Sequence, residues 1–351
     1  MLEFYKNKKI FITGHTGFKG TWFCRILLQA GAEVTGYALE PSTVPSFFIL
    51  TKTEEDIRSI IADIRNRDIL IRAMQDAKPD IVFHLAAQPL VRLSYSEPAD
   101  TYETNVMGTV NILEAVRKVS SVKSFVNVTT DKVYENKEWH WGYRENENLC
   151  GYDPYSNSKS CSELVTHSYR NSFFTEKDST AISTARSGNV IGGGDYAEDR
   201  IIPDCVRAVN TGNEIIIRNP HAIRPYQHVM ECLSGYLLLA EKQYEDKTLW
   251  GAYNFGPDDG SCIATGKLTE LFCKAWGSGA TWQVQHDKGP HEANFLKLDC
   301  SKSKAVLGWK PKWNIEMAVE KTVEFFRTDN DGERLYCVNK QIKEYFEGNH
   351  V

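Results

Sequence analysis

The chain has 351 residues, of which 42% are hydrophobic and 25% are charged, and its formal net charge is -5. A chain of this length can bury a large core, and its composition is typical of a globular enzyme with one large α/β domain or two interleaved ones. The mild negative charge and the lack of a basic stretch argue against a nucleic-acid-binding protein, which needs cations to neutralise a row of phosphates. A small anionic ligand held by a few local cations is compatible with these numbers.

The cysteine and histidine patterns argue against disulfide and metal sites. The nine cysteines include no CxxC pair, which predicts reduced thiols in a reducing compartment. The nine histidines show no HExxH or similar spacing, so we expect no metal site. The first residues, MLEFYKNKKIFITG, run directly into a predicted strand, and the apolar run at 47–50 is too short to span a membrane. We therefore expect a cytoplasmic protein.

Strands and helices alternate through the first half of the chain. Apolar, β-branched runs bounded by glycine or proline predict strands, and runs with an apolar stripe predict helices. In chain order the predicted elements are strand 8–14, helix 18–31, strand 32–39, helix 65–79, strand 80–88, helix 99–119, strand 124–131 and strand 179–192. Strands joined by helical crossovers pair in parallel, so the predicted fold is α/β: a doubly wound parallel sheet of the Rossmann type.

A glycine-rich loop joins the first predicted strand to the first predicted helix. Glycines with GxxGxxG spacing allow a tight turn, a close approach of the backbone to a pyrophosphate, and close helix–strand packing. The helix N-terminus adds unpaired amides and the positive end of its dipole. The loop predicts a dinucleotide site formed by Gly14, His15, Thr16, Gly17, Phe18, Lys19 and Gly20.

The residues after the second predicted strand favour NAD over NADP. An acid near this strand end binds the ribose hydroxyls of NAD, whereas arginines there suit the extra phosphate of NADP. Glu40 lies about 20 residues beyond the last glycine, as this rule expects, although the strand tip at Ala38 or Leu39 leaves it somewhat far. Asp63 has two interpretations: it holds the adenine ring through neighbouring backbone at Ile64, or it caps the next helix.

Beyond residue 192 the alternation of strands and helices weakens, and loops such as HAIRPYQHV and FGPDDG follow. This change predicts a smaller substrate lobe over the carboxyl edge of the sheet. We expect residues 1–185 to form the dinucleotide-binding domain that carries the catalytic residues. Residues 186–351 then form mainly the substrate lobe, partly interleaved with the first domain.

Tyr155 and Lys159 share one face of a helix that is predicted to begin near Asp153 and Pro154. An ammonium beside a phenol favours the phenolate, so it lowers the tyrosine pKa and makes the phenol a usable base. The pair follows a glycine loop and a strand that ends in Thr130 and Asp131, which makes the spacing more informative than it is alone.

These motifs together resemble the extended short-chain dehydrogenase/reductase superfamily. GHTGFKG, HLAAQ, TNVMGT, TTDKVY and YSNSK occur in this order and span essentially the whole chain. Within the superfamily, TDKVY, RPYQHV and the His15/Lys19 form of the glycine loop most resemble the CDP-D-glucose 4,6-dehydratase family. The related dTDP-glucose enzymes carry Thr-Asp-Glu where this chain has Thr-Asp-Lys.

The resemblance implies a reaction in which bound NAD is recycled. Tyr155 would take the proton of the sugar C4 hydroxyl, Thr130 would bind the same oxygen, and Lys159 would hold the nicotinamide ribose. Asp131 would protonate the departing C6 hydroxyl. Lys132 replaces the glutamate of the related enzymes, so the base for C5 stays open: Lys132 could act with a lowered pKa, stabilise the enolate, contact cofactor phosphates with His15, or be a solvated lysine.

The resemblance also implies further ligand contacts. The residues Leu85, Ala86, Ala87 and Thr129 would lie beside the cofactor. His84 would either pack within its strand or contact a ligand. On the substrate side the candidates are Asn105, Arg186, Asn189, Arg200 and Arg224, of which Arg224 suits a diphosphate best because a guanidinium fork matches its oxygens.

The same motifs leave two alternative functions open, and the resemblance implies a homo-oligomer. A nucleotide-sugar 4-epimerase would use Tyr155, Lys159 and NAD but needs no acid for C6, so Asp131 favours dehydration. A non-catalytic NAD sensor would not need the tyrosine and lysine. The resemblance implies a homodimer or homotetramer through helices 99–119 and 158–171, and a role in deoxysugar synthesis for bacterial O-antigen lipopolysaccharide.

Overall fold

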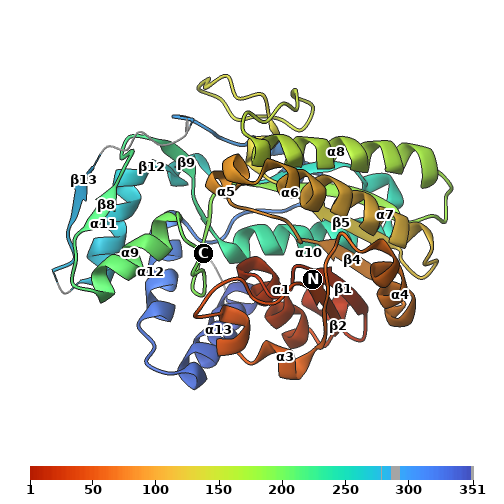
Figure 1. Cartoon of the computed structure of the whole chain (residues 1–351), viewed down its shortest axis with the longest axis horizontal. Coiled ribbons are helices and arrows are strands. Elements are labelled where there is room, and N and C mark those ends of the chain that lie inside the picture. Colours follow the sequence, from red (N-terminus) through yellow and green to blue (C-terminus); the bar gives the residue numbers. More distant parts are fainter. Residues whose placement is uncertain (278, 286–292, 349–351) are drawn as a thin grey trace.

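The computed structural model describes residues 1–277, 279–285 and 293–348. Its centre is a seven-stranded sheet in the order β11-β6-β5-β4-β1-β2-β3, with every neighbouring pair parallel (Figure 1). The strands are β1 (Lys9–Thr13), β2 (Glu33–Ala38), β3 (Arg58–Ile61), β4 (Ile81–His84), β5 (Ser124–Val128), β6 (Ala181–Ser187) and β11 (Ala252–Phe255). The strand order reverses between β1 and β4, so the predicted doubly wound fold is confirmed.

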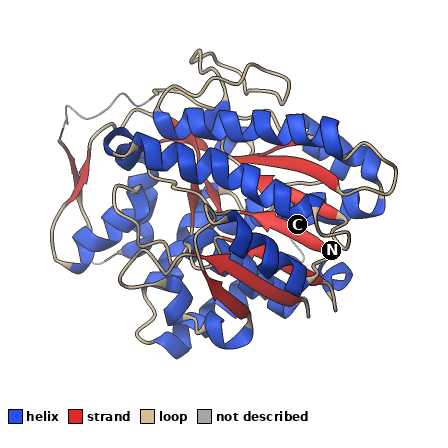
Figure 2. Ribbon diagram, turned by 45° about the vertical axis from the view of Figure 1, so that its right-hand side comes forward, coloured by secondary structure: helices blue, strands red, loops and turns tan. Residues whose placement is uncertain are grey.

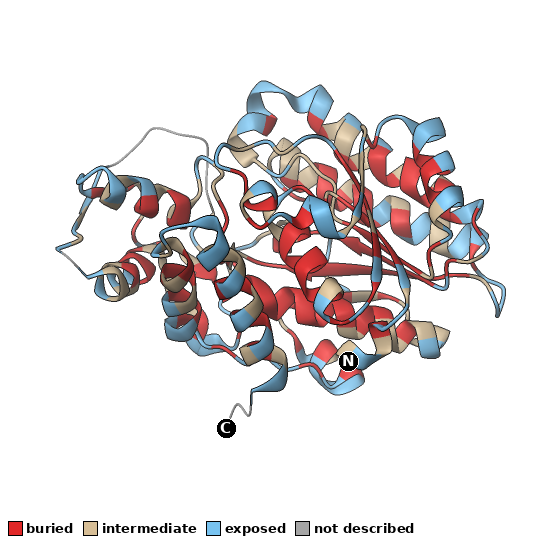
Figure 3. Cartoon of the chain, turned by 90° about the horizontal axis from the view of Figure 1, so that it is seen from below, coloured by how far each residue is buried: buried red, intermediate tan, exposed pale blue. Residues whose placement is uncertain are grey.

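Helices cover both faces of this sheet, and the alternation of side chains along each strand decides which face a residue supports (Figure 2). Ile10 and Ile12 of β1 pack in one core cluster, and Phe11 packs in the other. The first cluster contains residues of α1 (Phe18–Gln29), α10 (Val229–Glu245) and α13 (Asp331–Glu347), and the second contains residues of α4 (Arg67–Ala77) and α7 (Gly108–Arg117). The strands and the inner faces of these helices are accordingly buried (Figure 3).

The helix that carries Tyr155 begins where the sequence predicts. Asp153 caps α8 (Pro154–Phe173) by accepting the amide of Ser156 at 2.9 Å, and Pro154 occupies the first helical position. The predicted helix 99–119 instead divides into α6 (Pro98–Tyr102), a π-helical turn (Glu103–Met107) and α7. The division occurs around Asn105, whose amide is bonded outside this helix, to Gln88 and Ser158.

Short elements near the groove escaped prediction. β3 is an edge strand of mixed polarity, without the apolar run of a central strand. The predicted strand 179–192 ends at Ser187, and a separate strand, β7 (Val190–Ile191), follows. The remaining short helices of this half are α2 (Phe47–Leu50), α3 (Thr53–Asp56) and α5 (Val91–Ser96).

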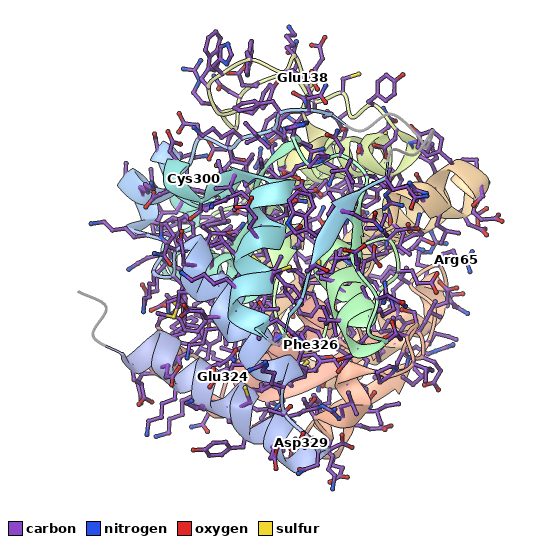
Figure 4. All side chains as sticks on the ribbon, turned by 90° about the vertical axis from the view of Figure 1, so that its left-hand side faces the viewer. Arg65, Glu138, Cys300, Glu324, Phe326 and Asp329 are labelled. Atoms are coloured by element: carbon purple, nitrogen blue, oxygen red, sulfur yellow. The ribbon has the colours of Figure 1, made fainter. Side chains whose placement is uncertain are left out.

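A smaller lobe lies beside the sheet, with its own core of residues from α9 (Ile201–Asn210), α11 (Thr265–Trp276) and α12 (Ile315–Phe326) (Figure 1). Its strand pairs are β7 with β10 (Gln227–His228), β9 (Ile223–Pro225) with β12 (Cys262–Ala264), and β8 (Ile215–Ile217) with β13 (Trp282–Val284). Phe326, labelled in Figure 4, packs against both the lobe core and the first sheet core. Residues after 186 therefore build the lobe and also return to the main layers as α10, β11 and α13.

All nine cysteines are free thiols. Within the described ranges, the structure contains no helix long and apolar enough to cross a membrane. The same residues contain no cluster of three His, Cys, Asp or Glu side chains that could hold a metal ion.

Candidate active site

A groove of about 1760 Å³ runs along the carboxyl ends of the parallel strands, between the sheet and the lobe. It is lined by the β1–α1 loop, the ends of β4 and β5, the start of α8, the segment after β6, and residues of α9 and β8. Ligands of open α/β sheets bind at this edge, beside the point where the strand order reverses. The volume exceeds the roughly 300–1,000 Å³ of a typical small-molecule pocket, so it has room for a dinucleotide and a second ligand.

The glycine loop forms a cradle of backbone at one end of the groove. Gly14 has a φ of 77°, and a Cβ there would lie 2.8 Å from the amide nitrogen of Ala86. At Gly20 a Cβ would lie 2.1 Å from the Gly14 carbonyl oxygen, so the helix can approach the loop only without a side chain. A Cβ at Gly17 would have only an ordinary contact, 3.5 Å from the Gly14 carbonyl oxygen. No side chain caps the N-terminus of α1. The cradle therefore fits the diphosphate of a dinucleotide, whose oxygens can take the amides of this helix end.

His15 and Lys19 leave this loop in different directions. The His15 ring is buried, bonds Ser59 at 2.8 Å through Nε2, and does not line the groove, so the predicted contact of this side chain with the cofactor is not supported. Burial lowers its pKa to about 4, which keeps the ring neutral. Lys19 lines the groove and donates to Ser187 at 3.2 Å, while Thr16 and Phe18 also line it. Burial lowers the pKa of Lys19, although the Asp131 carboxylate opposes the shift.

Asp63 and Ile64 lie at the far end of the cradle and line the groove together with Glu40. The interpretation of Asp63 as a helix cap is wrong, because Asn66 caps α4 by accepting the amide of Ile69 at 3.2 Å. Asp63 Oδ2 instead accepts a hydrogen bond from Arg65 Nε at 2.9 Å. This hydrogen bond lowers the pKa of the Asp63 carboxyl. Arg65 lies at the rim of the molecule in Figure 4.

Tyr155 and Lys159 face the end of β5. Burial raises the pKa of Tyr155 to about 12, against the Arg200 charge and a hydrogen bond with Thr130, which both lower it. The Lys159 ammonium donates to the Val128 carbonyl at 3.2 Å. Its pKa falls to about 8 because of burial and the nearby Lys19 charge. The structure thus brings Tyr155 and Lys159 to the strand end that carries Thr130.

Asp131 has one satisfied and one unsatisfied carboxylate oxygen. The Asp131 residue is 1% exposed. Its Oδ1 accepts a hydrogen bond from the Thr130 hydroxyl at 3.0 Å, and its Oδ2 is buried without a hydrogen-bond partner among the described residues. Gly188 makes room for Oδ2, because a Cβ there would lie 2.9 Å from it. A buried unpaired carboxylate is costly unless it is protonated or meets a ligand. Lys132 lines the same stretch of groove, and within the described part of the chain its ammonium forms no ion pair.

Arg224 is a buried cation on the lobe side of the groove. It is 8% exposed and donates to the Ile223 carbonyl at 3.0 Å and to the Ala293 carbonyl. No carboxylate lies within ion-pair distance of it among the described residues. Asn189 also lines the groove, with Oδ1 buried and unpartnered, and Arg200 is paired with Asp195 at 3.3 Å. These groups fit an anionic ligand in the groove that Tyr155, Lys159 and Asp131 also line.

The structure does not bring Arg186 and Asn105 to the groove, so both assignments to the substrate need correction. Arg186 is buried against Glu163 and borders a separate hollow of about 690 Å³. Asn105 is buried, where its Oδ1 accepts the Gln88 amide at 2.8 Å and its Nδ2 donates to Ser158 at 2.9 Å. Both fix packing between elements.

The predicted cofactor contacts at the ends of β4 and β5 do line the groove. They are Leu85, Ala86, Ala87 and Thr129. His84 is packed: it bonds Thr13 at 2.7 Å, and burial lowers its pKa to about 3.

Sequence reasoning missed several groove residues. Arg218 follows β8 directly and bonds Asp199 at 3.2 Å, so the run EIIIR offered a strand-end cation as a signal. Ser187 and Gly188 supply a lysine partner and space for Asp131, but no local pattern distinguishes them from other small residues.

A doubly wound sheet with a glycine cradle, a Tyr–Lys helix and a strand-end Thr–Asp defines the extended class of short-chain dehydrogenases/reductases. The family model described as GDP-mannose 4,6 dehydratase matches residues 11–322, and the chain belongs to this family. A relative in Salmonella typhimurium, a CDP-glucose 4,6-dehydratase, is 47% identical over 349 residues, covering 98% of this chain and 97% of the relative. A dTDP-glucose 4,6-dehydratase of Streptomyces antibioticus is 28% identical, covering 91% and 92%.

Solved structures show the same fold. A UDP-glucose 4-epimerase of Thermotoga maritima with UDP-glucose has a TM-score of 0.78 at 25% identity, covering 91% of this chain and 98% of its own. A dTDP-glucose 4,6-dehydratase of Bacillus anthracis in complex with NAD has a TM-score of 0.76 at 22% identity, covering 95% and 97%. The predicted resemblance to this superfamily is confirmed.

Proposed function

We propose that this protein converts CDP-D-glucose to CDP-4-dehydro-6-deoxy-D-glucose and water. The observation that carries this proposal is Asp131, whose unpartnered buried oxygen lies in the groove beside Tyr155. A 4-epimerase needs no acid at this position, whereas loss of the C6 hydroxyl does, because hydroxide is a poor leaving group. The 47% identical CDP-glucose 4,6-dehydratase supports the same reaction and the choice of nucleotide.

The cofactor is NAD, which Gly14, residues 16–20, 63–64 and 85–87, and Lys159 would hold. When bound, NAD supplies a reversible hydride store that takes the C4 hydrogen and gives it back at C6. The cradle at Gly17 has room for a diphosphate. At the adenosine end, Glu40 and Asp63 line the groove and the Arg65 side chain is held by Asp63, which fits the ribose hydroxyls of NAD better than an additional phosphate.

Tyr155 removes the proton of the C4 hydroxyl, and Thr130 bonds the same oxygen. The pKa of about 12 that burial gives this tyrosine must fall for efficient catalysis. The Arg200 charge and the hydrogen bond with Thr130 favour the phenolate, against burial and the Asp131 and Asp153 charges. The resulting C4 ketone acidifies the C5 proton.

Asp131, in its protonated form, donates its proton to the C6 oxygen as the C6–O bond breaks, so that the hydroxyl leaves as water, while a base takes the C5 proton and the C5–C6 double bond forms. Lys132 is our candidate for the C5 step, either as a base or by stabilising the enolate. A Lys132→Ala variant that keeps full turnover and full exchange at C5 would remove Lys132 from the mechanism.

The lobe binds the nucleotide part of the substrate. Arg224, Asn189 and Arg200 are the proposed diphosphate contacts, since Arg224 has only carbonyl partners within the described ranges. This assignment divides the chain functionally into a catalytic and cofactor part (residues 1–185) and a mainly substrate-binding part (186–351).

We also propose a homo-oligomer formed through α7 and α8. Leu164 and Phe173 of α8 are exposed, as is Met107 immediately before α7, which leaves apolar side chains on this face. Light scattering on the purified protein distinguishes a monomer, a dimer and a tetramer. The nine free cysteines fit a reducing cytoplasm, and the product chemistry fits deoxysugar synthesis for a surface polysaccharide.

The deciding experiment gives the purified protein CDP-glucose, dTDP-glucose, GDP-mannose and UDP-glucose separately in deuterated water, with products followed by mass spectrometry and NMR. We expect loss of one water from CDP-glucose alone, solvent deuterium at C5 and the original C4 hydrogen at C6. Dehydration of a different nucleotide sugar would overturn the substrate. Epimerisation without water loss would overturn the role of Asp131, and no conversion of any sugar would indicate a non-catalytic NAD-binding protein.

A further inference from the structure

Glu163 and Arg186 form a buried ion pair outside the groove. The proposed chemistry does not use this pair. Arg186 Nε lies 2.9 Å from Glu163 Oε1, and Nη2 lies 2.9 Å from Oε2, while both side chains are 3% exposed. Thr129 and Thr184 donate to the same two oxygens at 2.5 and 2.7 Å. The carboxylate is therefore fully satisfied by residues of β6 and of the segment that follows β5. Burial alone would lower the pKa of Arg186, but the Glu163 charge outweighs it and raises that pKa.

The pair lies on the helix face that carries the proposed catalytic residues. Tyr155, Lys159 and Glu163 are spaced at i, i+4 and i+8 along α8, so they share one face. Lys159 donates to the Val128 carbonyl, and Glu163 accepts from the Thr129 hydroxyl one residue further along. Two successive residues at the end of β5 thus hold two successive turns of α8, immediately before Thr130 and Asp131.

Arg186 extends this connection away from the groove. Its Nη1 donates to the Tyr134 hydroxyl at 2.7 Å and to the Glu145 carbonyl at 3.0 Å. Tyr134 in turn donates to Asn254 of β11 at 2.7 Å. All donors of Arg186 that the structure pairs point to protein acceptors, which leaves this arginine no direct role at a ligand in the groove.

We propose that Glu163 and Arg186 are positioning residues that fix α8 against the carboxyl ends of β5 and β6, so that Tyr155 and Lys159 face Thr130 and Asp131 in the reactive arrangement. This inference rests on the proposed dehydratase function. A displacement of about 1 Å in a reacting group can cost on the order of a hundredfold in rate, even when the mutated residue is remote from the chemistry. Asn127 of β5 also donates to Ser162 and Thr166 of α8. The Glu163 contact differs from these bonds because it holds Thr129, the residue directly before Thr130.

The charge of Glu163 also acts on Lys159 itself. The groups that face Lys159 are Lys19 from α1, neutral His84 from β4, and Tyr155 and Glu163 from its own helix. Of these, Glu163 supplies the negative charge that favours the ammonium, against burial and Lys19. Loss of this charge should therefore shift the alkaline limb of the rate profile to lower pH.

The test is the double variant Glu163→Gln with Arg186→Met, which removes both charges together and leaves neither buried alone. We expect kcat to fall about a hundredfold with KM for CDP-glucose changed less than about threefold. We also expect a larger kinetic isotope effect with substrate deuterated at C4, because misplaced Tyr155 and Lys159 slow the oxidation step. A folded double variant with wild-type kcat, isotope effect and pH profile would overturn the inference.

Thr129→Val provides a second measurement if the double variant does not fold, since it removes only the bond from the end of β5 to Glu163. We expect a lower kcat and a larger isotope effect, with a small loss of thermal stability because a buried carboxylate loses one hydrogen bond. An unchanged kcat with an unchanged isotope effect would overturn the inference. Glu231→Gln is the matched control. Glu231 is a buried glutamate of α10 that accepts from Tyr345 and the Lys312 and Trp313 amides, so its loss should lower stability and leave kcat unchanged.

Wild-type protein in the same assay separates two kinds of failure. If the wild type does not dehydrate CDP-glucose, the proposed function is wrong. If the wild type is active and the double variant is equally active, only the inference about the pair is wrong.

Discussion

Arg186 and Arg224 are both buried arginines, yet their surroundings are opposite. Arg186 forms a two-pronged ion pair with Glu163 and further bonds to Tyr134 and Glu145. Arg224 reaches only backbone carbonyls among the described residues. The same contrast separates the acids, because Glu163 accepts four hydrogen bonds, whereas Asp131 has an oxygen with none.

This difference shows which buried charged groups remain available to a ligand. Buried charges are normally paired, so a fully paired group is fixed by the fold and an unpaired one awaits a partner. The paired groups lie behind β6 and α8, and the unpaired groups face the groove. Variants of each kind should therefore fail differently: paired groups through folding and placement, unpaired groups through ligand binding and chemistry.

The largest effect on turnover is expected for Asp131→Asn. Removing the acid for C6 should lower kcat by about 10²–10⁴-fold. Stability should stay the same or rise, because an orphaned buried carboxylate is lost. Product formation by mass spectrometry and a urea titration measure the two quantities. A strong loss of stability would place Asp131 with the paired groups and break the comparison.

Arg186→Met should show the opposite behaviour. Leaving Glu163 as an unpaired buried charge should reduce the free energy of unfolding by about 3–5 kcal/mol. Adding Glu163→Gln should recover most of that loss. Denaturant titration of the two variants checks the difference, and a single variant as stable as wild type would contradict the structural role.

Arg224→Met should raise KM for CDP-glucose by roughly 10–100-fold, which corresponds to the loss of about 1.5–3 kcal/mol from charged hydrogen bonds. Its stability should not fall, since the arginine has no buried carboxylate partner among the described residues. Steady-state kinetics with parallel thermal melting makes the measurement. An unchanged KM with a lower melting temperature would make Arg224 a packing residue.

The dependence of kcat/KM on pH tests Lys159, which lines the groove and also feels the charge of the paired Glu163. Its pKa is lowered to about 8, so the fraction of charged lysine falls as pH rises through that value. Because the ammonium supports Tyr155, kcat/KM should fall about fivefold between roughly pH 8 and 9. Initial rates across this range provide the check, and a flat profile would show that the charge is not needed.

Gly17→Ala is expected to have the smallest effect. A Cβ at this position lies 3.5 Å from the Gly14 carbonyl oxygen, in ordinary contact, and the backbone φ is -80°. Stability should therefore change by less than about 0.5 kcal/mol, while the affinity for NAD falls a few-fold because the methyl enters the cradle. Calorimetric titration with NAD measures the affinity. A loss of stability without a change in affinity would assign this glycine to the fold alone.

Much of this arrangement was predictable because its signals are local. The glycine loop, the cap at Asp153 with Pro154, and the spacing of Tyr155 and Lys159 each act within a few residues of chain. The sequence could not show that His15 turns inward to Ser59, nor that Arg186 turns away from the groove, because both orientations depend on partners 44 and 23 residues away. The edge strand β3 escaped because its residues lack the apolar run of a central strand.

The sequence by itself therefore determined the doubly wound sheet, the glycine cradle at the β1–α1 junction and the common helix face of Tyr155 and Lys159. Helix and strand periodicity, caps and glycine turns are properties of short segments, and crossover lengths then make the strands parallel. Tertiary structure alone decided which buried charges are paired. Pairing depends on the contact of distant elements, as when α8, the end of β5 and β6 converge on Glu163 and leave Asp131 and Arg224 facing the groove.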